Sequence, residues 1–324
     1  MFEIYVHNSI DDWNRYFNDP PTVTNSDGSR QFRKTDPSGK YFVTDCIFGD
    51  LKMTCVSVNS VGPNYLGVSE TEFNKCSCDG GVPCTVFRNG SFFQCRVTGI
   101  NCTVRATTNN GIHTSVEARQ NSDDLNLIEE SSISGYTSET GGAVISNWYR
   151  YISFVLTNES NCKTNYNVGY LILNDPSGTS NINFCQFITN EADYICYKHA
   201  NSQHFIHCTN YLNSSYSSTK TTSPGVIYIG YANSLIYISN SVIKENSGQI
   251  LLYTYYSNII TDKCFIENPK IVMTASGNGD IQFNNNNIIS LCILVKTKYK
   301  TILQNKYCKR NSNNSLYSVV FFIT

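Results

Sequence analysis

Short apolar segments recur at nearly constant spacing through the C-terminal half of the chain. They are 182–187, 205–208, 236–240, 259–265, 281–283 and 302–307. Their first residues lie 23, 31, 23, 22 and 21 positions apart. Self-similarity at a period near 22 is typical of a solenoid, in which each repeat buries its apolar face only by stacking on its neighbours. The repeat therefore predicts the architecture, although it says little about activity.

The pattern extends upstream with less regularity, with strand starts expected at Phe42, Val68, Phe93, Leu127 and Ile152. Asn-, Ser- and Gly-rich turns separate two or three short strands in each repeat. We therefore expect an all-β fold, a single-stranded right-handed parallel β-helix of about ten to eleven rungs. The expected boundaries are a non-repeat N-terminal cap over 1–40, the β-helix over 41–308 and a C-terminal cap or tail over 309–324.

The predicted core combines large apolar side chains with cysteines. The apolar set is Phe48, Val97, Phe187, Ile243 and Phe265. Six of the fourteen cysteines are expected inside strands, namely Cys46, Cys76, Cys95, Cys185, Cys208 and Cys264. Reduced thiols acting as small buried hydrophobes are the favoured interpretation, and disulfides in some of them are the alternative.

Asparagine is expected to mark the corners between strands. Asn190, Asn213, Asn246 and Asn268 each follow the first strand of a repeat. Asn tolerates the left-handed backbone region and hydrogen-bonds locally to the main chain. Stacked inward amides could also form a ladder along the axis.

Composition argues against several function classes. Charged residues make up only 15% of the chain and the net charge is −1, so no global field favours nucleic acid or an anionic membrane. The N-terminus has no basic, apolar pattern of a secretory signal, and no segment is long enough to span a membrane. We therefore expect an intracellular protein, in the cytoplasm or a cytoskeletal or flagellar structure, with a cell-surface or secreted protein as the alternative.

Tetrapeptides in register with the repeat carry a family resemblance. Gly141-Gly-Ala-Val144, Phe187-Ile-Thr-Asn190 and Phe265-Ile-Glu-Asn268 match the GGA[ILV] and FxxN patterns, and Phe283-Asn-Asn-Asn286 does so more weakly. The chain over about 41–308 thus resembles the polymorphic-membrane-protein-like β-helices of chlamydiae and trichomonad parasites, and is closer to the trichomonad type. The resemblance implies a right-handed parallel β-helix with a surface or structural role and no catalytic residues to carry over.

An enzyme must be weighed because parallel β-helices also house polysaccharide lyases and hydrolases, which need clustered carboxylates. The adjacent acidic pairs are Asp11/Asp12, Asp123/Asp124 and Glu129/Glu130. We expect these pairs to be solvated surface charge, so catalysis is not expected. Nucleotide-binding and Ser-hydrolase motifs are absent, and no cofactor is expected.

Two further clusters could bind a soft metal. His199, His204 and His207 lie near Cys196 and Cys208, without a zinc spacing. The second cluster is Cys76-Ser-Cys78 with Cys84 and Cys95, for which zinc and a disulfide are the alternatives to plain core. Structural roles are favoured for both, so no metal site is predicted.

A basic stretch near the C-terminus is the candidate binding site for a partner. It contains Lys296, Lys298, Lys300, Lys306, Lys309 and Arg310, with no acidic residue among them. On the last rung these side chains would form a basic end on a nearly neutral rod, suited to an acidic partner such as a tubulin tail. We therefore expect a non-enzymatic structural rod that binds a larger protein assembly, possibly associated with microtubules. The alternatives are an adhesin-like surface module and, less favoured, a polysaccharide lyase or hydrolase.

Overall fold

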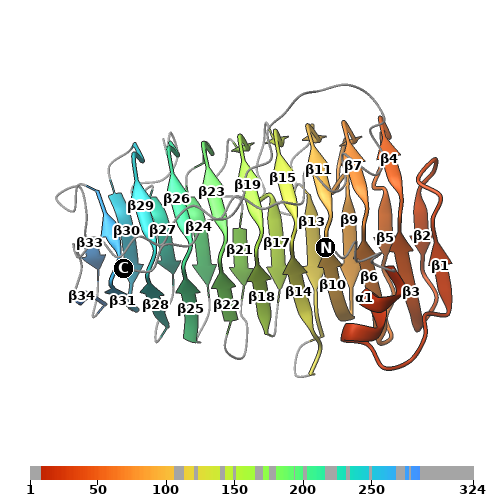
Figure 1. Cartoon of the computed structure of the whole chain (residues 1–324), viewed down its shortest axis with the longest axis horizontal. Coiled ribbons are helices and arrows are strands. Elements are labelled where there is room, and N and C mark those ends of the chain that lie inside the picture. The colour runs from red at the N-terminus through yellow and green to blue at the C-terminus, as the bar shows by residue number, and fades with distance from the viewer. Residues whose placement is uncertain are drawn as a thin grey trace, which may run out of the picture.

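The computed structural model is a parallel β-helix, an elongated coil of stacked strands (Figure 1). The described residues are 9–105, 113–119, 123–138, 143–148, 151–164, 171–174, 180–192, 194–199, 203–215, 225–230, 234–247, 250–267, 274–276 and 279–284. All the strand pairs in the sheets are parallel and join residues of successive rungs. The predicted fold class is confirmed.

Each full rung passes through up to four sheets in turn. The largest has eleven strands, in the order β1 (Val23–Asn25), β3 (Gly39–Thr44), β6 (Asn64–Ser69), β10 (Gly90–Cys95), β14 (Asn126–Glu129), β18 (Ile152–Val155), β22 (Ser180–Asn183), β25 (Gln203–His207), β28 (Leu235–Ser239), β31 (Asn258–Asp262) and β34 (Asp280–Asn284). The chain then enters a nine-stranded sheet of β4 (Ile47–Gly49), β7 (Glu72–Asn74), β11 (Thr98–Ile100), β15 (Ser132–Ser134), β19 (Asn158–Ser160), β23 (Gln186–Ile188), β26 (Asn210–Leu212), β29 (Val242–Lys244) and β32 (Phe265–Ile266).

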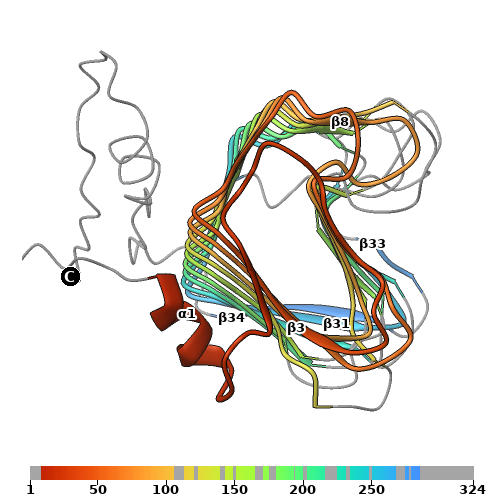
Figure 2. The same ribbon diagram turned by 90° about the vertical axis from the view of Figure 1, so that its right-hand side faces the viewer.

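The remaining two sheets complete the rung. A four-stranded sheet contains β8 (Ser77–Cys78), β12 (Thr103–Val104), β16 (Thr137–Ser138) and β20 (Lys163–Thr164). A ten-stranded sheet contains β2 (Phe32–Lys34), β5 (Val56–Val58), β9 (Thr85–Arg88), β13 (Thr114–Glu117), β17 (Ile145–Trp148), β21 (Leu171–Asn174), β24 (Tyr194–His199), β27 (Gly225–Gly230), β30 (Ile250–Tyr255) and β33 (Thr274–Ser276). The view along the axis shows the stacked rungs, with β8 at one side of the coil (Figure 2).

The corners rather than the strands hold most of the cysteines. At the corner between the eleven- and nine-stranded sheets, a residue with positive φ comes first in almost every rung, as at Asp45 (54°), Phe184 (56°) and Lys263 (51°). The next residue points inward, and its side chain donates to the carbonyl two residues before it, across the corner. Donors of this kind are Cys46, Thr71, Ser131, Thr157, Cys185, Thr209, Ser241 and Cys264.

Cysteine therefore alternates with Ser and Thr at one structural position. The expectation that six cysteines lie inside strands is corrected: of these, only Cys95 belongs to a strand. A thiol fits the corner because it is small enough for the interior and its S–H reaches the same carbonyl as a hydroxyl.

Asparagine has two different corner roles. Asn213 adopts positive φ (50°), as predicted from its tolerance of the left-handed region. Asn190 and Asn246 instead point inward and bond to the preceding rung. Their Oδ1 atoms accept from the backbone N–H groups of Cys162 and Ser214, each at 3.0 Å. Asn268 lies outside the described residues.

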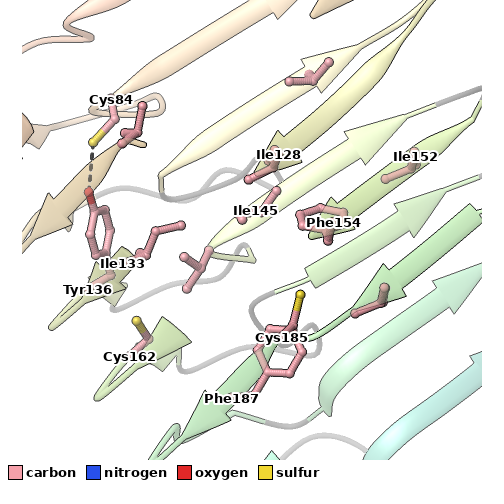
Figure 3. Close-up of a cluster of buried hydrophobic side chains, with 14 of the residues drawn as sticks. Cys84, Ile128, Ile133, Tyr136, Ile145, Ile152, Phe154, Cys162, Cys185 and Phe187 are labelled. Carbon is pink, nitrogen blue, oxygen red and sulfur yellow. Dashed lines mark hydrogen bonds between the residues drawn. The ribbon is translucent and has the colours of Figure 1, made fainter. Parts of the chain in front are cut away.

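The interior is a continuous apolar core in which equivalent residues stack from rung to rung (Figure 3). Phe48 and Phe73 stack at 5.3 Å between ring centroids, and Phe187 and Tyr211 at 5.0 Å. The predicted core residues Phe48, Val97, Phe187 and Ile243 are buried. Phe265 is only half-buried, because it pairs with the outward Val242, and the inward position belongs to Ile266. The second FxxN motif is thus one residue out of register with the first.

The sheets begin inside the predicted N-terminal cap. Strands β1 and β2, both before residue 41, pair in register with β3 and β5. The helix α1 (Ser9–Tyr16) lies against the outside of the coil (Figure 2). Residues 9–40 therefore contribute strands to the first rung and a helix to one side face.

Candidate interaction surface

The outer face of the eleven-stranded sheet is covered by α1 at its N-terminal end. Outward residues of successive strands there are Phe42, Gly67, Phe93 and Leu127. Trp13 packs on Phe42 and Phe93, at 5.6 and 6.2 Å between ring centroids, and Tyr16 lies 4.6 Å from Phe93. These aromatic residues form a second apolar cluster, separate from the interior.

Gly67 makes room for this cluster. A side chain at this position would collide with the rings of Phe93 and Phe42 on the neighbouring strands. The glycine thus allows two aromatic rings to meet across a strand.

A buried ionic cluster also holds α1 to the sheet. The guanidinium of Arg96, at the corner after β10, binds the carboxylates of Asp12 from α1, Glu70 at 2.6 Å and Glu130 at 3.3 Å. Burial disfavours its charge, yet the hydrogen bonds and the negative charge of Asp12 raise the pKa of Arg96 overall. Asp12 also accepts a hydrogen bond from Ser69. Beside this cluster, Glu129 accepts a 2.5 Å hydrogen bond from Tyr16 and pairs with Arg15.

All three acidic pairs are expected from the sequence to be solvated surface charge, and this expectation is wrong for two of them. Asp12 and Asp124 are buried, and each is paired with an arginine, Arg96 and Arg119 respectively. Sequence separation hid the first of these ion pairs, since Asp12 and Arg96 are 84 residues apart, whereas Arg119 and Asp124 are only 5 residues apart. The carboxylates are thus engaged in holding the fold.

Beyond α1 the same face carries an exposed aromatic strip. The outward column continues through Ser153, Asn181, Phe205, Tyr237 and Ile260. Phe205 is 37% exposed, and its ring lies 6.3 Å from that of Tyr237. Parallel sheets are ordinarily covered on both faces, so large side chains left open here indicate a contact surface.

Polar groups frame this strip. Tyr151, which is 39% exposed, accepts a 2.8 Å hydrogen bond from Nδ2 of Asn181. The hydroxyl of Tyr237 donates to Asp262 at 3.2 Å. The strip thus combines aromatic rings with oriented hydroxyl and amide groups. We define the aromatic strip as Tyr151, Asn181, Phe205, Tyr237 and Ile260.

The two histidines of the candidate cluster whose side chains the structure describes do not point to a common site. The side chains of His204 and His207 lie on opposite faces of β25: His204 is buried, and His207 is half-buried at the corner. Oγ of Ser239 lies 2.9 Å from Nδ1 of His207. The side chain of His199 lies outside the described residues. Among the described residues, no group of three or more His, Cys, Asp or Glu side chains is arranged to hold a metal ion.

The second cysteine cluster is divided by the sheet. Cys76 and Cys84 face the interior, whereas Cys95 lies on the outer face in the cluster under α1. Cys78 is half-buried in β8. No disulfide joins the cysteines that the structure describes.

The basic stretch, from Lys296 through Lys298, Lys300, Lys306 and Lys309 to Arg310, lies outside the described residues. The apolar pattern that begins at Phe205 does not by itself predict the aromatic strip, because it does not separate inward from outward residues. The signal was present in Gln203-His-Phe-Ile-His207, where only alternate residues are buried. Period-two burial places Ile206 inside and Phe205 outside.

Comparisons with protein-family models, curated proteins and solved structures each find no match to this chain. The resemblance to polymorphic-membrane-protein-like β-helices therefore stays a hypothesis. Within the described residues, no helix is both long and apolar enough to cross a bilayer.

Proposed function

We propose that the protein is a non-enzymatic structural rod that binds a partner protein in a larger assembly through the aromatic strip. The proposal rests on one observation: the outward residues of the eleven-stranded sheet form an unbroken column from the part under α1 to the aromatic strip. Its first part is covered by α1, and its second part leaves Phe205 and Tyr151 open.

The intramolecular contact indicates the chemistry of the partner. On the same face, α1 presents Trp13 and Tyr16 to the outward side chains of the sheet. A partner segment suited to the strip is therefore an amphipathic helix with aromatic residues on one side. Large aromatic side chains contribute most of the binding energy in such contacts.

A peptide with the sequence of residues 9–19 is the direct probe. Added to the intact protein, it should bind weakly, and Phe205→Ser with Tyr237→Ser should weaken binding at least tenfold in fluorescence anisotropy. Val61→Ser is the matched control, because Val61 is 93% exposed and lies outside the strip. The proposal would be contradicted if the peptide did not bind the wild type, or if it bound the double variant as tightly as it binds Val61→Ser. Self-association that Phe205→Ser abolishes would assign the strip to a second copy of this chain instead.

The basic stretch supports a second proposal for the partner, from sequence alone. Six basic residues without an acid favour an acidic, repetitive assembly such as the microtubule surface, where weak contacts add up. Reversing Lys296, Lys298, Lys300 and Lys306 to Glu should abolish salt-sensitive co-sedimentation with microtubules. Co-sedimentation unchanged at low and high salt would exclude this stretch as the contact.

An intracellular location is part of the same proposal. Glycan mass on the native protein would contradict it and would favour the cell-surface alternative. Intact-mass measurement of protein from its natural source decides between them.

A further inference from the structure

Two columns of inward residues lie next to each other beside the four-stranded sheet that contains β8, β12 and β16. The first column precedes the ten-stranded sheet and consists of Cys55, Cys84 and His113, stacked because Val56, Thr85 and Thr114 are in register. The second column precedes the four-stranded sheet and consists of Cys76, Cys102 and Tyr136. We call this place the neck.

Side chains of the two columns contact one another on successive rungs. Cys76 shares side-chain hydrogen bonds with both Cys55 and Cys102, and Cys102 also shares one with Cys84, so only the pairs Cys55–Cys76 and Cys84–Cys102 would use all four thiols. In the next rung, Nδ1 of His113 lies 2.9 Å from the Tyr136 hydroxyl. All four thiols are completely buried. Figure 3 shows the Tyr136 hydroxyl pointing to Cys84, at 3.1 Å.

The corner rule does not account for these thiols as a group. Cys76 and Cys102 follow residues with positive φ, as corner cysteines do, whereas Cys55 and Cys84 do not. Cys55, Cys76 and Cys102 also donate to the carbonyl two residues earlier, as the corner cysteine Cys185 does. In addition to these carbonyl contacts, the neck thiols contact thiols of adjacent rungs.

We propose that the neck is a site of two disulfides, Cys55–Cys76 and Cys84–Cys102, formed when the protein folds in the presence of a small-molecule disulfide. Each bond joins the same two columns, and together they use all four thiols. They would close short loops, between residues 55 and 76 and between residues 84 and 102. Disulfides across loops of this size stabilise chiefly by restricting the unfolded chain.

Each protein disulfide would form in two exchange steps with one molecule of a small disulfide such as oxidised glutathione, which is reduced to two thiols. The Cys76 thiolate attacks one sulfur of the reagent, whose S–S bond breaks and releases one thiol. Cys55 then loses its proton and attacks the Cys76 sulfur, releasing the second thiol. Hydrogen bonds from Cys102 and Cys55 lower the pKa of Cys76, which favours the attacking thiolate. Cys84 and Cys102 react in the same way with a second reagent molecule.

The test refolds the intact protein in a glutathione redox buffer and, in parallel, under reductant. Free thiols are then alkylated in denaturant and counted by mass. The oxidised sample should carry ten alkylated cysteines and the reduced sample all fourteen. Peptide mapping should identify the two named pairs, and the oxidised protein should melt at a higher temperature.

Two variants separate the neck from the other buried thiols. Cys55→Ser should retain Cys84–Cys102 and gain one free Cys76 thiol, whereas Cys185→Ser should retain both disulfides. Fourteen alkylated cysteines in the folded, glutathione-treated wild type would overturn the proposal. A map that joins Cys76 to Cys102 would do the same, and the wild-type map decides even where a variant fails to fold. The inference uses no residue of the aromatic strip or of the basic stretch, but these disulfides in protein from its natural source would favour the cell-surface or secreted alternative over the intracellular location.

Discussion

The ring of His113 and the hydroxyl of Tyr136 are hydrogen-bonded inside the β-helix, with Nδ1 and the phenolic oxygen 2.9 Å apart. Nε2 of His113 accepts from Nε2 of Gln94 at 3.3 Å, because the Gln94 Oε1 atom already accepts from Thr114. Nδ1 therefore carries the proton and donates to Tyr136. The imidazole is neutral, and complete burial lowers its pKa to about 3.

Acid should destabilise the fold through His113. The unfolded chain binds a proton near the ordinary pKa of about 6.5, so stability is full above that pH and falls as the pH drops toward 3. Between pH 7 and 5 the loss from this group should be about 2 kcal/mol. Urea unfolding at pH 7 and pH 5 should show that the free energy of unfolding falls less for His113→Leu than for the wild type. His207→Gln is the comparison: burial lowers the pKa of this half-buried imidazole as well, but less than that of His113, so His207→Gln should reduce the loss by less. A pH dependence for His113→Leu equal to that of the wild type would disprove the assignment.

Glu159 should act in the opposite direction. It lies in the interior between Ile133 and Phe187 of the neighbouring rungs, and its Oε2 atom has no hydrogen-bond partner. Burial raises its pKa well above the ordinary value, so the folded protein holds it neutral while the unfolded chain ionises above about pH 4.5. Its contribution to stability is therefore lost as the pH rises.

Replacing this carboxyl should stabilise the protein at neutral pH. Glu159→Leu should raise the free energy of unfolding at pH 7, and the gain should shrink as the pH falls toward 4.5. Denaturant unfolding at pH 5 and 7 measures both. Glu191→Leu, at an exposed ion pair with Lys163, should change stability by about 0.5 kcal/mol or less. A Glu159→Leu protein less stable than the wild type at pH 7 would show that the carboxyl has a stabilising role.

Arg96 should be the most costly charge to remove. Arg96→Leu leaves Asp12, Glu70 and Glu130 close together without their cation, which should cost about 3–5 kcal/mol. The helix should also detach, exposing the buried Trp13. Denaturant unfolding measures the cost, and Trp13 emission in a Trp148→Phe background reports detachment. Lys163→Met, at the exposed pair, should cost about 1 kcal/mol or less. Equal losses of stability in Arg96→Leu and Lys163→Met would refute the proposed role of Arg96.

The corner position should accept Thr in place of Cys. Thr157 and Thr209 occupy the positions equivalent to Cys185 on the two neighbouring rungs, and both hydroxyls donate to the carbonyl two residues earlier. Cys185→Thr should therefore change stability by about 1 kcal/mol or less, within the range of one net hydrogen bond. Cys185→Leu should cost about 1–3 kcal/mol through overpacking. Thermal unfolding compares them, and similar losses in both variants would argue against an equivalence of thiol and hydroxyl here.

Local sequence patterns predicted the repeat, its period and most of the core. Phe187 and Ile243 could be placed inside because each belongs to a short apolar strand followed by polar corner residues. The register of single residues was harder to predict. A shift of one position turns a side chain from one face to the other, and it placed Phe265 in the core where Ile266 lies.

The sequence by itself thus determined that this chain is a parallel β-helix, because period and alternation are local properties that each rung repeats. Tertiary structure alone decided which distant residues meet. Arg96 gathers three carboxylates, α1 covers one part of a face and leaves Phe205 open, and Cys55 faces Cys76. Stacking brings residues of different rungs together, and the length of each connecting loop sets which ones. Those lengths vary from rung to rung, so spacing along the chain does not specify the contacts.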